Sequence, residues 1–143
     1  LIGLETLPLR MRQHMKNAEL VANFLKNHSK VNYVSWAGFK ENIYHELAKK
    51  YFKDGFGSVF TFSLKSGYEG AMQLVENCNL ISHLANVGDT RSLIVHPAST
   101  THRQLSNEQK EKSGVGDSII RLSIGLESHK DIIADLEGAL STI

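Results

Sequence analysis

The sequence predicts an α/β domain of the α+β two-layer sandwich type, with about four strands in one sheet and helices packed on one face. A chain of 143 residues, 41% hydrophobic and 22% charged, has the size and composition of one domain with a core. Helical and strand patterns alternate along the whole chain. The clearest strands have one apolar and one semi-polar face, which suits a sheet covered by helices on one side.

A long amphipathic helix is predicted near the start of the chain. Apolar residues recur in alternate steps of four and three from Met11 to Leu25, which places them on one helix face. Thr6 is a suitable N-cap, and Pro8 is tolerated in the first turn. The chain starts without a methionine and enters this pattern at once, so we expect a fragment cut at a domain boundary.

Strands and helices then alternate to the end of the chain. β-Branched and aromatic residues or flanking turn residues predict strands over 31–36, 58–64, 80–87 and 117–125. Helical spacing predicts helices over 42–52, 67–78, 106–114 and 127–143. Ser106 and Gln109 have the spacing of a capping box at the start of the third of these helices.

An arginine interrupts the last predicted strand. Ile120, Leu122 and Ile124 share one face of that strand, while Arg121 lies on the other. An arginine in that position is rarely left without a partner. Either it pairs with a local carboxylate such as Asp89 or Asp117, or it is a fixed guanidinium that binds a carboxylate or phosphate of a ligand in a bidentate manner. The residues alone leave both interpretations open.

Composition excludes several classes of function. The formal net charge of +1 and the scattered lysines offer no electrostatic basis for binding nucleic acid or an anionic membrane. No apolar run approaches the roughly 20 residues that a bilayer span needs. Cys78 is the only cysteine, so an intrachain disulfide is impossible, and a reducing, cytoplasmic location is expected. We interpret Cys78 as a buried structural thiol.

The segment "NVGDTRSLIVHPASTTH", residues 86–102, carries hydroxyls and imidazoles but no catalytic pattern. A Ser-His triad is disfavoured because no strand-to-helix nucleophile elbow surrounds these residues. His96 and His102 do not have zinc-ligand spacing, so no metal site is expected. We expect Pro97 to shape a turn in which the hydroxyls bond to the local backbone.

That segment, followed by "IIRLSIGLE", resembles the C-terminal domain of the pyridoxal-phosphate-dependent enzymes of cysteine and methionine metabolism. The similarity covers essentially the whole chain. "NVGD" followed by "SLIVHPASTTH" is similar to the O-acetylhomoserine sulfhydrylases, whereas many lyases and synthases of the family carry Ser-Leu-Gly at the first three positions. The resemblance implies a linking helix over 1–28 and, over 29–143, the small domain of fold type I, with a mostly antiparallel sheet.

The resemblance also implies a substrate site. Arg121 is expected to bind the α-carboxylate of an amino-acid substrate, with Asn86, Val87 and Thr101 in or near the same pocket. The catalytic lysine and the residues that hold pyridoxal 5'-phosphate are expected in a preceding large domain. The chain is therefore expected to contain no catalytic residue and to be inactive alone, whereas the intact enzyme binds the cofactor.

The implied activity of the intact enzyme is γ-replacement. O-acetyl-L-homoserine and sulfide, or methanethiol, give homocysteine, or methionine, and acetate, in a homo-oligomer expected to be a tetramer. The alternatives are a cystathionine γ-synthase or a methionine or cystathionine γ-lyase of the same family. A second alternative is a non-catalytic interaction module whose semi-polar sheet face docks another chain.

Overall fold

The computed structural model describes the backbone of residues 1–143 and all side chains except those of residues 107 and 111. In chain order the elements are α1 (Ile2–Glu5), α2 (Leu7–Asn27), β1 (Val31–Ser35), α3 (His45–Tyr51), β2 (Val59–Leu64), α4 (Gly67–Asn77), β3 (Ser82–His83), β4 (Leu93–Val95), the 3-10 turn η1 (Pro97–Ser99), α5 (Asn107–Lys112), β5 (Ile119–Ser123) and α6 (His129–Ser141).

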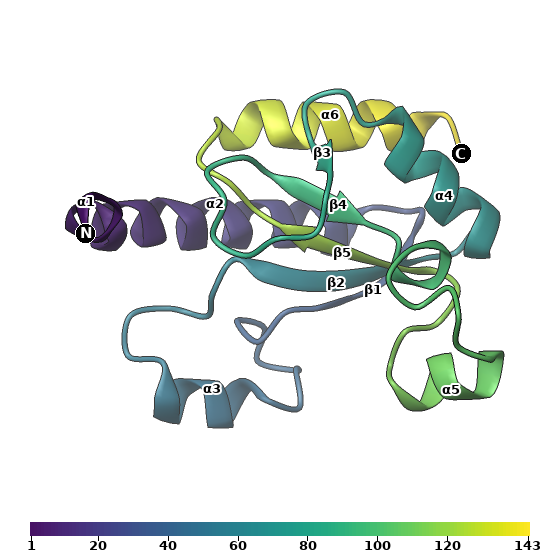
Figure 1. Cartoon of the computed structure of the whole chain (residues 1–143), viewed down its shortest axis with the longest axis horizontal. Helices are drawn as coiled ribbons and strands as arrows, with labels where there is room; N and C mark the ends of the chain where they lie inside the picture. The colour runs from purple at the N-terminus through teal and green to yellow at the C-terminus, as the bar shows by residue number, and fades with distance from the viewer.

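The strands form one five-stranded sheet in the order β1-β2-β5-β4-β3. All neighbouring pairs are antiparallel except β3 and β4, which are parallel. Figure 1 shows α2, α4 and α6 on one side of the sheet and the short helices α3 and α5 on the other. The predicted fold class, a mostly antiparallel sheet in an α/β sandwich, is confirmed.

The sheet has one strand more than the sequence suggests. The additional strand, β4, is only three residues long and lies inside segment 86–102. Such a short apolar run has too few residues to show a period of two. Conversely, the strand expected over 80–87 is reduced to Ser82–His83, because the residues that follow leave the sheet in an exposed loop.

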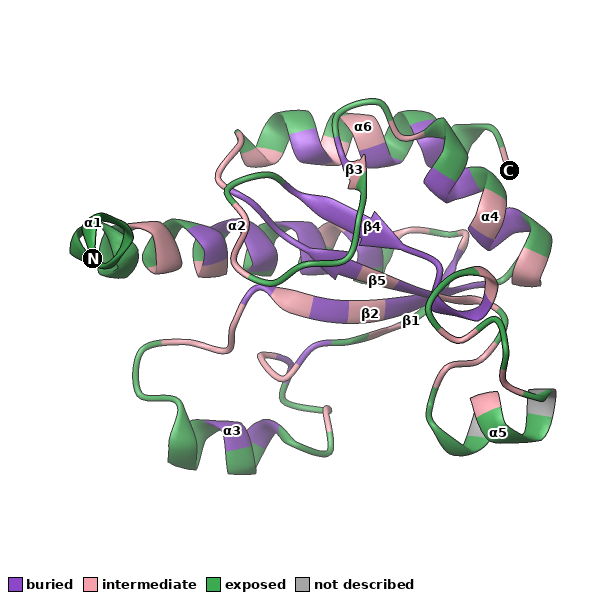
Figure 2. Ribbon diagram, in the orientation of Figure 1, coloured by how far each residue is buried: buried purple, intermediate pink, exposed green. Residues whose placement is uncertain are grey.

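The core lies between the sheet and the three long helices, as Figure 2 shows in purple. Phe62, Ile120 and Leu122 cover the inner face of the two central strands, and each is fully buried. Ala18, Ala22 and Leu25 of the predicted helix face are fully buried in the same core, together with Val21. Met11 and Met15, which begin that face, are only partly buried, so the prediction is confirmed for the second half of α2. Helix α2 packs directly on the rest of the domain. The proposed domain boundary near residue 28 remains a prediction.

Local helix signals are also visible. Gln109 N–H donates to Ser106 Oγ at 3.3 Å, and Gln109 Oε1 accepts the Ser106 N–H at 2.9 Å, so the predicted capping box is confirmed. Helix α2 starts after Thr6 and contains Pro8 in its first turn, as expected. Within the described residues, no helix has the length and apolarity that crossing a membrane requires.

Candidate functional site

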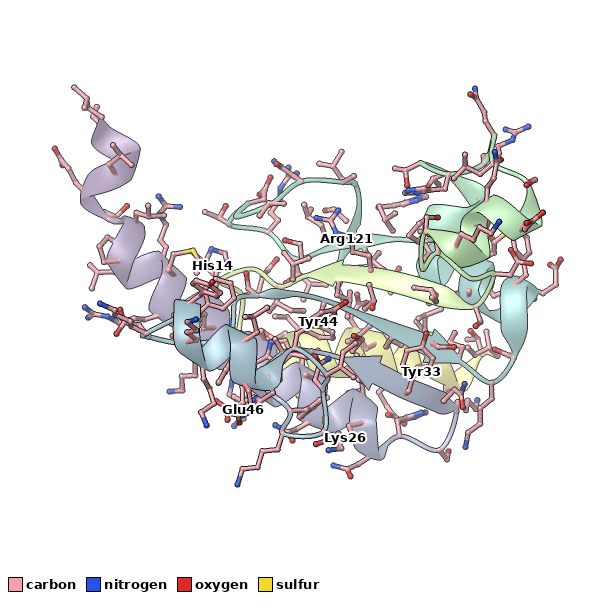
Figure 3. All side chains as sticks on the ribbon, turned by 90° about the horizontal axis from the view of Figure 1, so that it is seen from below. His14, Lys26, Tyr33, Tyr44, Glu46 and Arg121 are labelled. Atoms are coloured by element: carbon pink, nitrogen blue, oxygen red, sulfur yellow. The ribbon has the colours of Figure 1, made fainter. Side chains whose placement is uncertain are left out.

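Arg121 lies in the middle of β5, the central strand of the sheet. Its neighbours across the sheet are Thr61 of β2 and Val95 of β4. Because Ile120 and Leu122 point into the core, the Arg121 side chain projects from the opposite face, where it is half-buried. Figure 3 shows Arg121 beside the loop that connects β3 to β4. The backbone of Arg121 is therefore held in place by the neighbouring strands on both sides.

The loop between β3 and β4, residues 84–91, contacts this arginine through its backbone. Arg121 Nη2 donates to the carbonyl oxygen of Asn86 at 3.3 Å. The Asn86 side chain stays within the loop, where its Oδ1 accepts the Val87 N–H at 2.8 Å. The structure therefore brings Asn86 and Arg121 together, with Val87 exposed next to them. The contact uses the main chain of Asn86, so it does not depend on the side chain at that position.

The carboxylates that could pair with Arg121 have other partners. Asp89 Oδ1 lies 3.4 Å from Arg91 Nε, and Asp117 Oδ1 lies 3.9 Å from Lys110 Nζ. The Arg91 backbone N–H and then its guanidinium lower the pKa of Asp89. No ion pair formed by the described side chains includes Arg121. The local ion pair with Asp89 or Asp117 is therefore not formed, and the binding of a ligand by Arg121 stays a prediction.

Thr101 lies in the turn segment after η1. Its Oγ1 is 2.8 Å from His102 Nδ1, and its side chain is exposed. Residues 100–105 line an open cavity of about 660 Å³. No hydrogen bond of Thr101 reaches Arg121 or Asn86 in the part of the chain that the structure describes. The site role of Thr101 therefore stays a prediction.

His96 anchors the turn at η1 and has no catalytic geometry. Its Nε2 is 2.8 Å from the Asp117 carbonyl and its Nδ1 is 2.9 Å from Ser99 Oγ. Thr100 Oγ1 donates to the His96 carbonyl at 2.8 Å, so the hydroxyls bond locally, as predicted. Burial lowers the pKa of His96, which keeps the imidazole neutral near pH 7.

Cys78, the C-cap residue of α4, is half-buried. Burial, together with the nearby Asp135, raises the pKa of the Cys78 thiol to about 12. The thiol is therefore protonated at neutral pH and is a poor nucleophile, which agrees with its interpretation as a structural residue.

The lysines do not fit a pyridoxal phosphate site. That cofactor requires an amine in an enclosed pocket together with donors for the phosphate. Lys30 Nζ donates to the Leu140 carbonyl at 2.7 Å, and Lys110 pairs with Asp117, while the remaining lysines are exposed. Among the side chains that the structure describes, no three His, Cys, Asp or Glu residues converge as ligands for a metal ion.

Sequence reasoning missed a polar cluster behind the loop. Glu127 follows the arginine strand in "RLSIGLE", and its carboxylate binds Ser92 at the start of β4. The available signal was a glutamate two residues after a glycine at a strand end. That pattern does not identify the partner, because Ser92 lies 35 positions away.

The fold and the site together define a sandwich domain that presents Arg121 on the sheet face opposite the core. Such a group suits the recognition of a carboxylate or phosphate at one end of a small ligand. Residues 1–141 match the family described as Cys/Met metabolism PLP-dependent enzymes. The chain belongs to this family.

Known proteins of the family are similar over nearly the whole chain. O-acetyl-L-homoserine sulfhydrylase 1 of Thermus thermophilus is 48% identical over 141 residues, which are 99% of this chain and 34% of that protein. An L-methionine gamma-lyase of Fusobacterium nucleatum subsp. polymorphum is 45% identical over 141 residues, 99% of this chain and 35% of that protein. The chain thus spans about a third of the length of these relatives.

A solved structure supports the same placement. A crystal structure from Campylobacter jejuni, named as an O-acetylhomoserine (thiol)-lyase, superimposes with a TM-score of 0.92 at 47% identity. The match covers 97% of this chain and 33% of that one. That protein carries a pyridoxyl-lysine phosphate group.

Proposed function

We propose that this chain is the C-terminal domain of an O-acetylhomoserine sulfhydrylase. The complete enzyme would make homocysteine, or methionine, and acetate from O-acetyl-L-homoserine and sulfide, or methanethiol. The main observation behind the proposal is that the Arg121 guanidinium lies on the sheet face opposite the core and takes part in no ion pair of the described side chains. The relatives named as sulfhydrylases provide the substrate class.

The role proposed for this domain is to hold the substrate by its α-carboxylate. Arg121 has five N–H donors in a planar fork, and one Nη2 bond to Asn86 leaves donors for two carboxylate oxygens. The planar fork of a guanidinium is preorganised, so little entropy is lost for each hydrogen bond that it forms. Holding the carboxylate in one place aligns the α-carbon with the reacting centre and so lowers the barrier. Asn86, Val87 and Thr101 are proposed to line this carboxylate pocket.

The cofactor chemistry is proposed to come from outside residues 1–143. The exposed or carbonyl-bound lysines support the view that this chain alone is inactive and does not bind pyridoxal phosphate. We further propose that the complete enzyme is a homotetramer. Absorbance of the purified 143-residue chain after incubation with pyridoxal phosphate tests the first point. A stoichiometric absorbance band of bound pyridoxal phosphate would contradict the proposal that the cofactor is held outside residues 1–143, although it would leave the fold and the role of Arg121 untouched.

The test of the proposal uses Arg121→Ala in the complete enzyme. Truncating one partner of a desolvated charge pair costs about 2–5 kcal/mol, so kcat/KM for O-acetyl-L-homoserine should fall by roughly 30-fold or more. Lys130→Ala is the matched control, because Lys130 is an exposed cation of α6. A kcat/KM for Arg121→Ala within twofold of wild type would remove Arg121 from the site.

A methionine γ-lyase is the second candidate, because relatives with that name are 45% identical. The two activities differ in their need for a second substrate. Turnover that requires both O-acetyl-L-homoserine and sulfide supports the sulfhydrylase. Elimination from methionine without added sulfide supports the lyase and leaves the proposed role of Arg121 unchanged.

A further inference from the structure

A cluster of hydrogen bonds joins the end of β5 to the start of β4. Glu127 Oε1 accepts the Ser92 N–H at 2.7 Å, and Glu127 Oε2 accepts the Ser92 hydroxyl at 2.9 Å. Ser92 Oγ in turn accepts the Gly125 N–H at 2.8 Å. Ser92 is fully buried, so its hydroxyl both donates and accepts within this cluster. We call the contacts among Glu127, Ser92 and Gly125 the clamp.

Helix α2 is hydrogen-bonded to the turn that carries Gly125 and Glu127. Asn17, which is fully buried, donates to the Gly125 carbonyl at 3.0 Å and to the Glu127 carbonyl at 2.8 Å. The Leu126 N–H donates to the Thr90 carbonyl at 2.8 Å. The turn that carries Glu127 is therefore attached to a core helix, and the clamp is a rigid point from which the chain enters β4.

The loop of residues 84–91 depends on a few polar contacts. Leu84 is 45% exposed and Val87 is 68% exposed, so apolar packing holds the loop weakly (Figure 2). Asp89 Oδ1 accepts the Arg91 N–H at 3.0 Å, which closes a turn inside the loop. The loop returns to the sheet at the clamp, and its earlier part touches Arg121 through the Asn86 carbonyl.

The geometry points to Glu127 as a positioning residue for the carboxylate site, an inference that rests on the proposed function. By holding Ser92, the Glu127 carboxylate fixes the point where the loop ends and hence where the Asn86 carbonyl meets Arg121. That carbonyl occupies one Nη2 donor and thereby selects one orientation of a flexible side chain. The remaining N–H donors are then already oriented toward the position of the substrate carboxylate before the substrate binds.

Glu127→Gln tests the clamp with almost no change in volume. The amide oxygen can still accept the Ser92 N–H, but the NH₂ group cannot accept the Ser92 hydroxyl. Ser92→Ala removes the same hydroxyl from the other side. Glu76→Gln is the matched control, because Glu76 is an exposed carboxylate of α4.

The first readout is binding to the complete cofactor-loaded enzyme. L-Norvaline and butylamine differ only by the carboxylate, so they report separately on the Arg121 side of the pocket. We expect the inhibition constant of norvaline to rise about tenfold in Glu127→Gln, as for the loss of one well-placed hydrogen bond. The constant for butylamine should stay within twofold. Equal rises for both compounds would show a general effect on the fold and would overturn the positioning role.

The second readout is hydrogen exchange of the loop amides, residues 85–91, without any amino acid present. Exchange should be faster in Glu127→Gln and in Ser92→Ala than in wild type, and unchanged in Glu76→Gln. The double variant should be no faster than either single variant, because both remove the same contact. Unchanged exchange in the single variants would overturn the inference.

The two proposals fail in different ways. If Arg121→Ala leaves norvaline binding unchanged, the proposed carboxylate site is wrong, even where Glu127→Gln still accelerates exchange in the loop. If Arg121→Ala abolishes the preference for norvaline over butylamine and Glu127→Gln does not reduce it, the site is correct and the positioning role of Glu127 is wrong.

Discussion

Gly125 is the position at which we expect a single methyl group to have the largest effect on stability. An ideal Cβ built on Gly125 would lie 2.4 Å from the backbone carbon of Arg91 and 2.4 Å from the nitrogen of Ser92. Carbon atoms in ordinary contact are about 3.5–4.0 Å apart. Gly125→Ala therefore requires the start of β4 to move by roughly 1 Å from the end of β5, because two of the clashing atoms are backbone and cannot rotate away.

The expected cost follows from the contacts that such a movement breaks. Overpacking of a filled site costs about 1–3 kcal/mol. Separation of the strands also weakens the 2.8 Å bond from the Gly125 N–H to Ser92 Oγ, which adds about 1–2 kcal/mol for buried groups left without partners. Together these give roughly 2–5 kcal/mol, or a fall in Tm of about 6–20 °C for a domain of this size.

Gly138→Ala is the matched control. Gly138 lies in α6 with no atom within 4 Å of its ideal Cβ, so alanine there should stabilise the helix by about 1 kcal/mol. Urea unfolding of both variants can be followed by the fluorescence of Trp36, the only tryptophan, which is 5% exposed in the fold. A Gly125→Ala variant within about 1 kcal/mol of wild type, next to a normal Gly138→Ala, would refute the steric argument.

Two further predictions follow from shifted pKa values. Cys78, with a pKa of about 12, should react with iodoacetamide at pH 8 more than about tenfold more slowly in the native chain than in urea, and equal rates would contradict its protonated state. Burial lowers the pKa of His96, so its contribution to stability is present above the ordinary value of 6.5 and is lost as pH falls below it. The free energy of unfolding should therefore drop more steeply from pH 7 to pH 5 in wild type than in His96→Asn; parallel slopes in the two urea titrations would argue against this.

Local patterns were sufficient for most of the secondary structure. The capping box at Ser106 and the burial of Ala18, Ala22 and Leu25 in α2 were predictable because each depends on residues within a few positions of one another. The two faces of β5 were predictable for the same reason, since alternation in a strand follows directly from backbone geometry. The short strand β4 was not, because three residues do not establish a period.

The candidate site shows the same difference between local patterns and contacts of distant residues. The sequence by itself determined that an arginine interrupts an apolar strand, and its motifs placed the chain in the correct family. Only the tertiary structure decided that Arg121 meets the Asn86 carbonyl instead of Asp89 or Asp117, and that Glu127 holds Ser92. These partners are brought together by the strand order β2-β5-β4. Periodicity records only which face a residue occupies, whereas the choice of a distant partner depends on how the whole sheet is assembled.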